Sequence, residues 1–383
     1  MYSQQDLNEA VAAGAISAES ADALRSYVAQ ARSTPVTDEE NFRLLNSFND
    51  IFVSIGVVIM LLAAGAIGQA IGGALAAAPE YPDYETATAA QWRAVEAAQM
   101  LRDSTMVIIA GMLVAATSWG LAEFFTRRRR MALPSILLLV AFVGGVFATF
   151  VGISLAMLSS SSGEMDRVGA VLIAVAGLFA AGAAWLHWRR FMVPITVAAG
   201  AAGVSVTVVG LILAAIGPDS SSDIENLVLG IVFALGIGIF IYAMRWDTSD
   251  RERTTRRSDV AFWLHLLAAP MIAHPVFNWI GVMEGTDRVG VGSAVGVLAI
   301  YVLFGLVALA VDRRALLVSA LAYVLVALTF LFDEFGAVEL NFALTALVIG
   351  SALLTLSAFW TPIRNALVGG LPGGLQDRLP LAA

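Results

Sequence analysis

Apolar stretches long enough to cross a lipid bilayer follow one another through most of this chain. A helical span needs about 20 apolar residues. Only 14% of the residues are charged, whereas soluble proteins have about 25%. We therefore expect an all-α fold, a polytopic transmembrane helix bundle. The ten expected spans cover residues 50–74, 105–125, 133–158, 168–188, 192–216, 227–244, 260–283, 289–311, 315–332 and 342–360.

The more polar ends of the chain divide it into three parts. Residues 1–47 are expected to form a cytoplasmic helical hairpin and then an interfacial helix, because apolar residues recur there at helical spacing. Such a hairpin is too short to bury a core of its own. Residues 48–361 make up the expected bundle, and residues 362–383, which begin with a proline, are expected to be a flexible cytoplasmic tail.

The placement of arginine predicts the orientation of the bundle. Basic residues are enriched in the cytoplasmic loops of membrane proteins. With both termini in the cytoplasm, 18 of the 22 basic residues, all of them arginine, fall on the cytoplasmic side. The four on the other side are Arg93, Arg102, Arg167 and Arg288. We therefore expect a multi-pass protein of the inner (plasma) membrane with both termini cytoplasmic.

The composition excludes several classes of function. The net charge of −8 provides no basic face for nucleic acid, and the absence of cysteine excludes disulfides and thiolate metal sites. The motifs HExxH, GxSxG and GxxxxGK[ST] are absent as well. We therefore expect no catalytic residues, no metal and no cofactor, and the protein is not expected to be an enzyme. The lipid bilayer is the one partner that the composition requires.

The seventh span concentrates the polar residues of the membrane region. His265 and His274 lie within it, and Asn278 follows His274 by one helical turn on the same face. Ionisable residues in hydrocarbon are costly and usually face a bundle interior or a water-filled cavity. Helix breaks are expected at Pro270 and Pro275, because each proline lacks a backbone N–H and clashes with the preceding turn.

Three explanations of this candidate polar site are consistent with the sequence. In the first, His274 and Asn278 hydrogen-bond to neighbouring helices and hold the bundle together. In the second, they line a polar cavity for a solute or a proton. The third, metal ligation, would need His187, His265 and His274 in one place. His187 itself is expected to be an ordinary interfacial residue at the end of its span.

A short motif recurs at two of the turns between spans. The residues RRMALP at 129–134 return as RRFMVP at 189–194, a shift of 60 residues. Turns between spans of equal length are periodic without any duplication, so the recurrence has two explanations. The second is that two-helix hairpins were duplicated, and such repeats would be parallel because all copies have one orientation.

Small residues recur at four-residue spacing in several spans. Gly68 and Gly72 form one such pair, and Gly292 and Gly296 form another. Small residues at this spacing let two helices approach closely in lipid. They predict helix packing and carry no information about activity.

The opening pattern of the chain has a counterpart in known sequences. It consists of Leu7, Val11, Gly14, Ile16, Ser17, Glu19 and Leu24. This pattern, followed by arginine-marked spans, resembles uncharacterised bacterial multi-spanning membrane proteins that begin with a short cytoplasmic helical hairpin, a domain of unknown function. The resemblance implies the same architecture and a bacterial inner membrane, and no activity.

Two main hypotheses of function follow. The first is a non-catalytic membrane component, a scaffold or assembly protein that contacts a cytoplasmic partner or a second copy through residues 1–33. The alternative is a small-solute or ion transporter with a path along the broken seventh span. A membrane-embedded enzyme is a third hypothesis, but no nucleophile, base or metal site supports it.

Overall fold

The computed structural model describes residues 4–31, 48–159, 165–217, 224–251, 255–281, 291–334, 340–376 and 379–380. The chain divides into two compact units, Met1–Phe42 and Arg43–Ala382. The interfacial helix expected just before residue 48 lies outside the described residues.

The first unit contains two helices, α1 (Gln4–Ala12) and α2 (Ala18–Ala31). Gly14 follows α1 with φ of 69°, a left-handed conformation that glycine adopts without steric cost. The Ser17 hydroxyl accepts a hydrogen bond from the Ser20 backbone N–H at 3.1 Å and so caps the start of α2. The result is the helix–turn–helix unit that the local sequence signals predict.

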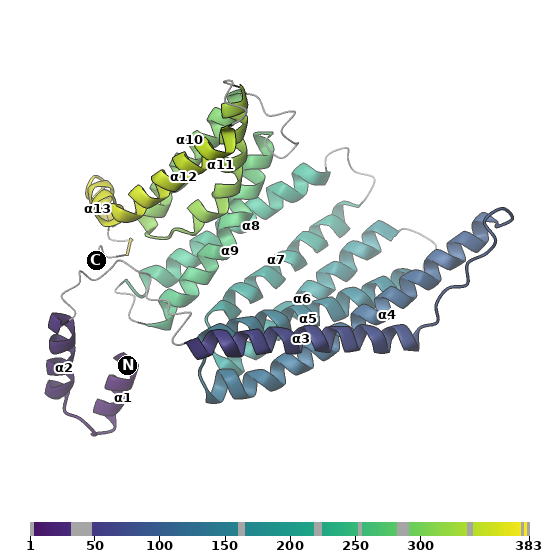
Figure 1. Ribbon diagram of the computed structural model, residues 1–383, viewed down its shortest axis with the longest axis horizontal. Helices are drawn as coiled ribbons and strands as arrows, with labels where there is room; N and C mark the ends of the chain where they lie inside the picture. The colour runs from purple at the N-terminus through teal and green to yellow at the C-terminus, as the bar shows by residue number, and fades with distance from the viewer. Residues whose placement is uncertain are drawn as a thin grey trace. The chain divides into compact units, whose positions relative to one another are not determined.

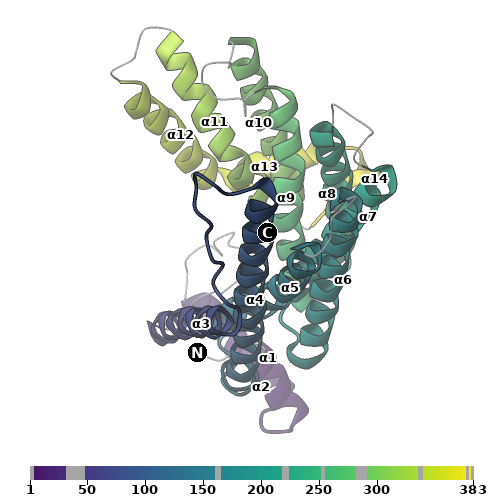
Figure 2. The same cartoon turned by 90° about the vertical axis from the view of Figure 1, so that its right-hand side faces the viewer.

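The second unit is an all-helical bundle (Figures 1 and 2). Within the described ranges, nine helices are long and apolar enough to cross a membrane, and a tenth span is formed if the pair α12–α13, bent by 70°, is counted as one. The predicted membrane helix bundle is confirmed. Its elements are α3 (Phe48–Leu75), α4 (Ala89–Ala122), the π-helix η1 (Glu123–Arg128), α5 (Ala132–Ser159), α6 (Met165–Phe191), α7 (Ile195–Ile216), α8 (Ile224–Thr248), α9 (Arg256–Trp279), α10 (Val291–Val311), α11 (Ala315–Glu334), α12 (Asn341–Ala358), α13 (Trp360–Gly369) and α14 (Gly373–Gln376).

Consecutive helices form antiparallel pairs in this bundle. The closest pairs are α4 with α5, α6 with α7, α8 with α9 and α3 with α4, and α10 pairs with α11. Because the chain direction alternates, the turns that follow α4, α6, α8 and α10 lie at one end of the bundle (Figure 1). These turns carry most of the arginines of the bundle, and we call this end the arginine-rich end.

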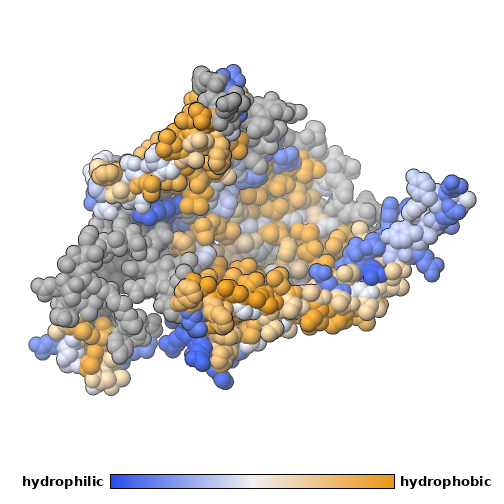
Figure 3. Space-filling view, in the orientation of Figure 1, coloured by the Kyte–Doolittle hydropathy of each residue, from blue (hydrophilic) through white to orange (hydrophobic). Residues whose placement is uncertain are grey.

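Large apolar side chains cover the outer surface of the bundle. On α3, Phe52 is 74% exposed and Leu62 is 68% exposed. Figure 3 shows an apolar surface along α3 and a hydrophilic one at the connection between α3 and α4. Such a large exposed apolar surface is unstable in water and stable in hydrocarbon, as a membrane bundle requires.

Glycines set the distance between α4 and α5. A Cβ atom added to Gly111 would lie 2.6 Å from the Gly145 carbonyl oxygen and 2.9 Å from the Thr149 backbone nitrogen. A Cβ atom on Gly145 would lie 2.8 Å from the Gly111 carbonyl oxygen. The two backbones therefore touch at a point where no larger residue fits.

The pair α6–α7 repeats this packing. A Cβ atom on Gly177 would lie 2.8 Å from both the Gly203 carbonyl oxygen and the Thr207 backbone nitrogen. Gly177 thus takes the place of Gly111, 66 residues earlier, and Gly203 that of Gly145, 58 residues earlier. The two hairpins therefore have the same local helix register at their closest contact.

The shift of 60 residues seen in the turn motif differs from this register. The touching glycines are 34 residues apart in the first hairpin and 26 in the second. The stretch between the touching glycines is therefore eight residues longer in the first hairpin, and it includes the π-helix η1 (Glu123–Arg128). Because of the extra length, the RRMALP and RRFMVP segments do not occupy equivalent positions.

Helix α9 is the central element of the second half of the bundle. In an apolar stretch of 18 residues in α9, 56% of the residues are buried. The share is 17–33% in the corresponding stretches of the other eight spanning helices among the described residues. It runs without interruption through Pro270 and Pro275, where the sequence predicted breaks. Neighbouring helices pack against it on several sides, and such packing maintains a proline-containing helix in a membrane.

The C-terminal region differs from the flexible tail that the sequence predicted. Helix α13 starts at Trp360, just before the expected tail, and α14 follows it. The Trp360 and Arg364 side chains are 3% and 2% exposed. Burial of these two large side chains fixes the segment. Trp360 donates to Asp312 in the turn between α10 and α11, whereas Arg364 donates to Pro380 and lies near Asp312.

Candidate functional site

A buried ion pair joins α8 to the turn between α10 and α11. Arg313 Nη2 donates to Asp247 Oδ1 at 2.6 Å, and Arg313 Nε donates to Asp247 Oδ2 at 3.3 Å. The Asp247 side chain is fully buried and that of Arg313 is 4% exposed. Two parallel bonds between a guanidinium and a carboxylate are among the strongest hydrogen-bonded pairs in proteins.

Helix α9 joins this pair through two residues. His265 Nε2 lies 3.0 Å from Asp247 Oδ2, and since a carboxylate only accepts, the imidazole donates this bond. Arg313 Nη2 also donates to the Ser258 carbonyl oxygen at 3.2 Å and to the Ser258 hydroxyl at 3.3 Å. We call Asp247, Ser258, His265 and Arg313 the ionic cluster. It lies at the arginine-rich end and links α8, α9 and the α10–α11 turn.

The local backbone explains why Arg313 points inward. The Asp312 backbone N–H donates to Leu309 O at 3.3 Å and the Arg313 N–H donates to Ala308 O at 2.9 Å. These two bonds form a Schellman motif, which ends a helix with one residue in the left-handed conformation. Asp312 is that residue, with φ of 59°. The next residue of such a motif turns back toward the helix, and here it is Arg313.

Asp312 connects the same turn to α13. Its Oδ1 accepts a hydrogen bond from Trp360 Nε1 at 2.7 Å and lies 3.7 Å from Arg364 Nε. Arg364 Nη2 in turn donates to the Pro380 carbonyl oxygen at 2.8 Å. The Arg314 guanidinium lies over the Trp360 ring, 4.8 Å from its centroid. These contacts fix the bent segment after α12.

Asp250 caps the start of α9 beside the cluster. Its Oδ2 accepts hydrogen bonds from the Thr255 backbone N–H at 3.0 Å, from the Thr255 hydroxyl at 2.7 Å and from the Ser258 backbone N–H at 3.3 Å. A carboxylate at a helix N-terminus satisfies free backbone donors and interacts favourably with the helix dipole. Asp250, just after α8, therefore pairs with Thr255 and Ser258 at the start of α9.

Comparison of the chain with models of protein families, with curated proteins and with solved structures finds no match.

The three residues of the predicted polar site lie on α9 but have separate partners. His265 belongs to the ionic cluster, whereas His274 Nδ1 lies 2.8 Å from the Tyr323 hydroxyl of α11. Asn278 Nδ2 donates to Glu225 Oε1 of α8 at 3.5 Å. Nine residues along a helix correspond to about 14 Å, so the structure does not bring the two histidines together.

His187 lies in a buried position rather than at an interface. It is fully buried and 4.5 Å from Phe191, 5.9 Å from Phe142 and 6.3 Å from Trp119, measured between ring centroids. Its Nδ1 lies 3.4 Å from the Thr196 hydroxyl. The expectation of an interfacial residue placed His187 at the correct end of its helix but missed the neighbouring hairpin that covers it.

The sequence does not single out Asp247, Asp312 or Arg313 as members of a site. Arg313 contributes to the sequence prediction only as one of the arginines that set the orientation. Asp247 stands directly after Trp246 at the end of an apolar span, where a carboxylate is ordinarily hydrated. No local signal therefore marks it as a buried residue or identifies its arginine.

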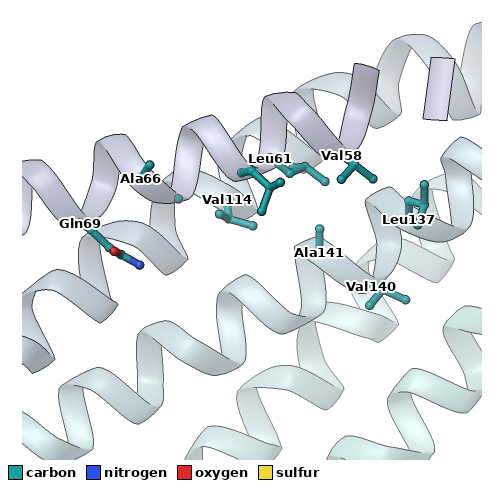
Figure 4. A pocket seen from close by; sticks show the side chains of 10 residues that line it. Val58, Leu61, Ala66, Gln69, Val114, Leu137, Val140 and Ala141 are labelled. Carbon is teal, nitrogen blue, oxygen red and sulfur yellow. The ribbon is translucent and has the colours of Figure 1, made fainter. Parts of the chain in front are cut away.

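Two of the grooves on the surface of the described part of the bundle lie between neighbouring helices. One, of about 560 Å³, lies between α3, α4 and α5 and is lined almost entirely by apolar residues. Figure 4 shows its labelled lining, in which Gln69 of α3 is the polar side chain. The second lies between α6, α7 and α8. Neither groove is lined by His265, His274 or Asn278.

The contact between His274 and Tyr323 yields a stability prediction. His274→Leu should lower the free energy of unfolding by about 1–3 kcal/mol, because it leaves the half-buried Tyr323 hydroxyl without its partner. Adding Tyr323→Phe should recover part of the loss, since both polar groups are then removed. Melting temperatures in detergent test this. Strictly additive losses in the double variant would show that the two groups do not interact.

Proposed function

We propose that this protein is a non-catalytic component of a bacterial inner membrane. In this proposal the bundle is an anchor with both termini in the cytoplasm, and the hairpin α1–α2 binds a cytoplasmic protein partner. The observation that supports the proposal most directly is the division of the chain into a small helical unit and a separate membrane bundle.

The size of the hairpin supports a binding role. Units below about 40 residues rarely bury enough apolar surface to be stable alone. Within α1 and α2, Ala21 is fully buried, whereas Leu24 is 43% exposed. An exposed leucine on so small a helical unit is suited to contact with another protein.

The internal pairing of the bundle also supports an anchoring role. Two residues considered for a transport path form hydrogen bonds with neighbouring elements of the bundle. His265 bonds to Asp247, and His274 bonds to Tyr323. Hydrogen bonds across helices hold membrane bundles together. In this proposal the polar residues of α9 serve helix packing.

The test compares the full chain with a variant that lacks residues 1–33. After cross-linking in native membranes, a stoichiometric partner should co-purify with the full chain and be lost from the truncated one. The truncated protein should keep its melting temperature, because no span is removed. With the purified partner, Leu24→Glu should weaken binding, whereas Ala23→Glu on the same helix should not. Binding that survives the deletion would contradict the proposal.

One observation favours the transport alternative. Buried ionisable residues in membrane helices often mark an ion or proton pathway, and the ionic cluster contains a carboxylate, an imidazole and a guanidinium. Proton or solute uptake into liposomes separates the two functions. Uptake by the full chain that disappears in His265→Gln at an unchanged melting temperature would replace the scaffold proposal.

A further inference from the structure

The second groove is lined by aromatic residues from helices that belong to different pairs. It has a volume of about 310 Å³ and lies between α6, α7 and α8. We call it the aromatic groove. Its lining includes Trp185, Trp188, Gly200, Val204, Tyr242 and Trp246.

The helix packing explains why this groove exists. Close contacts join α6 to α7 and α8 to α9, whereas α7 and α8 share few contacts. The space between the two pairs opens to the outer surface of the bundle, where Trp185 is 58%, Val204 52% and Tyr242 43% exposed. In a membrane, such a space is open to lipid.

The groove is chemically different at its two ends. Trp185 and Trp188 belong to the last two turns of α6, and Tyr242 and Trp246 to the last two turns of α8. They therefore lie toward the arginine-rich end, as the aromatic residues of a membrane interface do. Gly200 and Val204 lie on α7 about one to three turns inward from its start. This deeper part of the groove is apolar.

A positive charge lies beside the aromatic end. The Arg189 guanidinium is 4.9 Å from the centroid of the Trp185 ring, which lines the groove. Arginine binds phosphate oxygens with two parallel hydrogen bonds. A phosphate group at this position would meet a cation.

We infer that the aromatic groove binds one phospholipid with an anionic headgroup. One of its acyl chains lies along Gly200 and Val204, and its phosphate lies next to Arg189. A second copy of the chain fits the groove less well, because in the same membrane it would bring its own arginine-rich end to this site. Like charges would then oppose each other, whereas an anionic lipid is complementary.

Two variants address the two parts of the groove. Gly200→Phe should block the acyl chain, since a Cβ atom at Gly200 meets only the Ala184 Cβ atom, at 3.6 Å, and the backbone can carry a side chain there. Gly144→Phe is its matched control, because Gly144 is exposed on α5, its added Cβ atom meets nothing within 4 Å and it does not line the groove. Arg189→Gln should remove the attraction for the headgroup. Arg128→Gln, an exposed arginine of η1 at the same end, is the control for charge.

The measurement is native mass spectrometry of the full chain in detergent. Phosphatidylglycerol and phosphatidylcholine with the same chains are added in equal amounts. Wild type and both control variants should retain one phosphatidylglycerol molecule in preference to phosphatidylcholine. Gly200→Phe should retain neither lipid at this site. Arg189→Gln should reduce the ratio of phosphatidylglycerol to phosphatidylcholine about fivefold. Melting temperatures identify the variants that remain folded.

Three results would overturn the inference. They are unchanged retention in Gly200→Phe, an unchanged lipid ratio in Arg189→Gln, and a wild-type dimer that Gly200→Phe dissociates, which would make a second copy the occupant. If Gly200→Phe does not fold, Val204→Trp fills the same groove from a side chain that is already 52% exposed. Retention of lipid by that folded variant would equally contradict the proposal.

Discussion

Arg313→Met should destabilise the bundle by about 3–5 kcal/mol, because it leaves the carboxylate of Asp247 buried without its cation. The Asp247 side chain is fully buried, and Arg313 donates both of the hydrogen bonds that this carboxylate accepts from a guanidinium. His265 alone cannot replace them, since it offers one donor to this carboxylate. The midpoint of thermal or denaturant unfolding in detergent measures the loss.

Two variants show whether the lost pair is the cause. Asp247→Leu combined with Arg313→Met should be more stable than Arg313→Met alone, since an apolar pair replaces a stranded charge. Arg314→Met, one residue away, removes the same charge. The interaction that it removes is a cation–π contact with Trp360 rather than a buried ion pair. This substitution should cost about 0.5–1 kcal/mol. If Arg314→Met and Arg313→Met are equally destabilising, net charge rather than the buried pair is responsible.

Gly145→Ala should destabilise the α4–α5 pair by about 1–3 kcal/mol, because the added methyl group overpacks a tight contact. Its Cβ atom would lie 2.8 Å from the Gly111 carbonyl oxygen and 2.9 Å from the Ala115 backbone nitrogen. Gly144→Ala is the matched control, since its Cβ atom meets nothing within 4 Å. In that control, alanine should be neutral or stabilising because of its higher helix propensity.

The shared register extends this prediction to the second hairpin. Gly203→Ala should cost about as much as Gly145→Ala, because its Cβ atom would lie 2.7 Å from the Ala181 backbone nitrogen. Gly200→Ala, one turn earlier on α7, should be tolerated. Unfolding in detergent compares all four variants. A large loss in Gly145→Ala without one in Gly203→Ala would show that the two hairpins are similar in geometry only.

The sequence by itself determined the class of the protein and most of its helices. The bilayer thickness sets the span length, so apolar stretches of about 20 residues predict spanning helices without knowledge of their partners. Local signals were also sufficient for the first hairpin, where Gly14 ends one helix and Ser17 caps the next. The predicted close packing at Gly68 and Gly72 is confirmed, since both lie against the backbone of α4.

Only the tertiary structure decided which polar groups meet. Asp247 and Arg313 are 66 residues apart in the chain, and nothing local to either residue identifies the other among 22 arginines. The continuity of α9 through Pro270 and the burial of Arg364 likewise depend on neighbouring helices. Span length is a property of one segment and its solvent. Pairing and burial are properties of several segments packed together, and therefore no single segment specifies them.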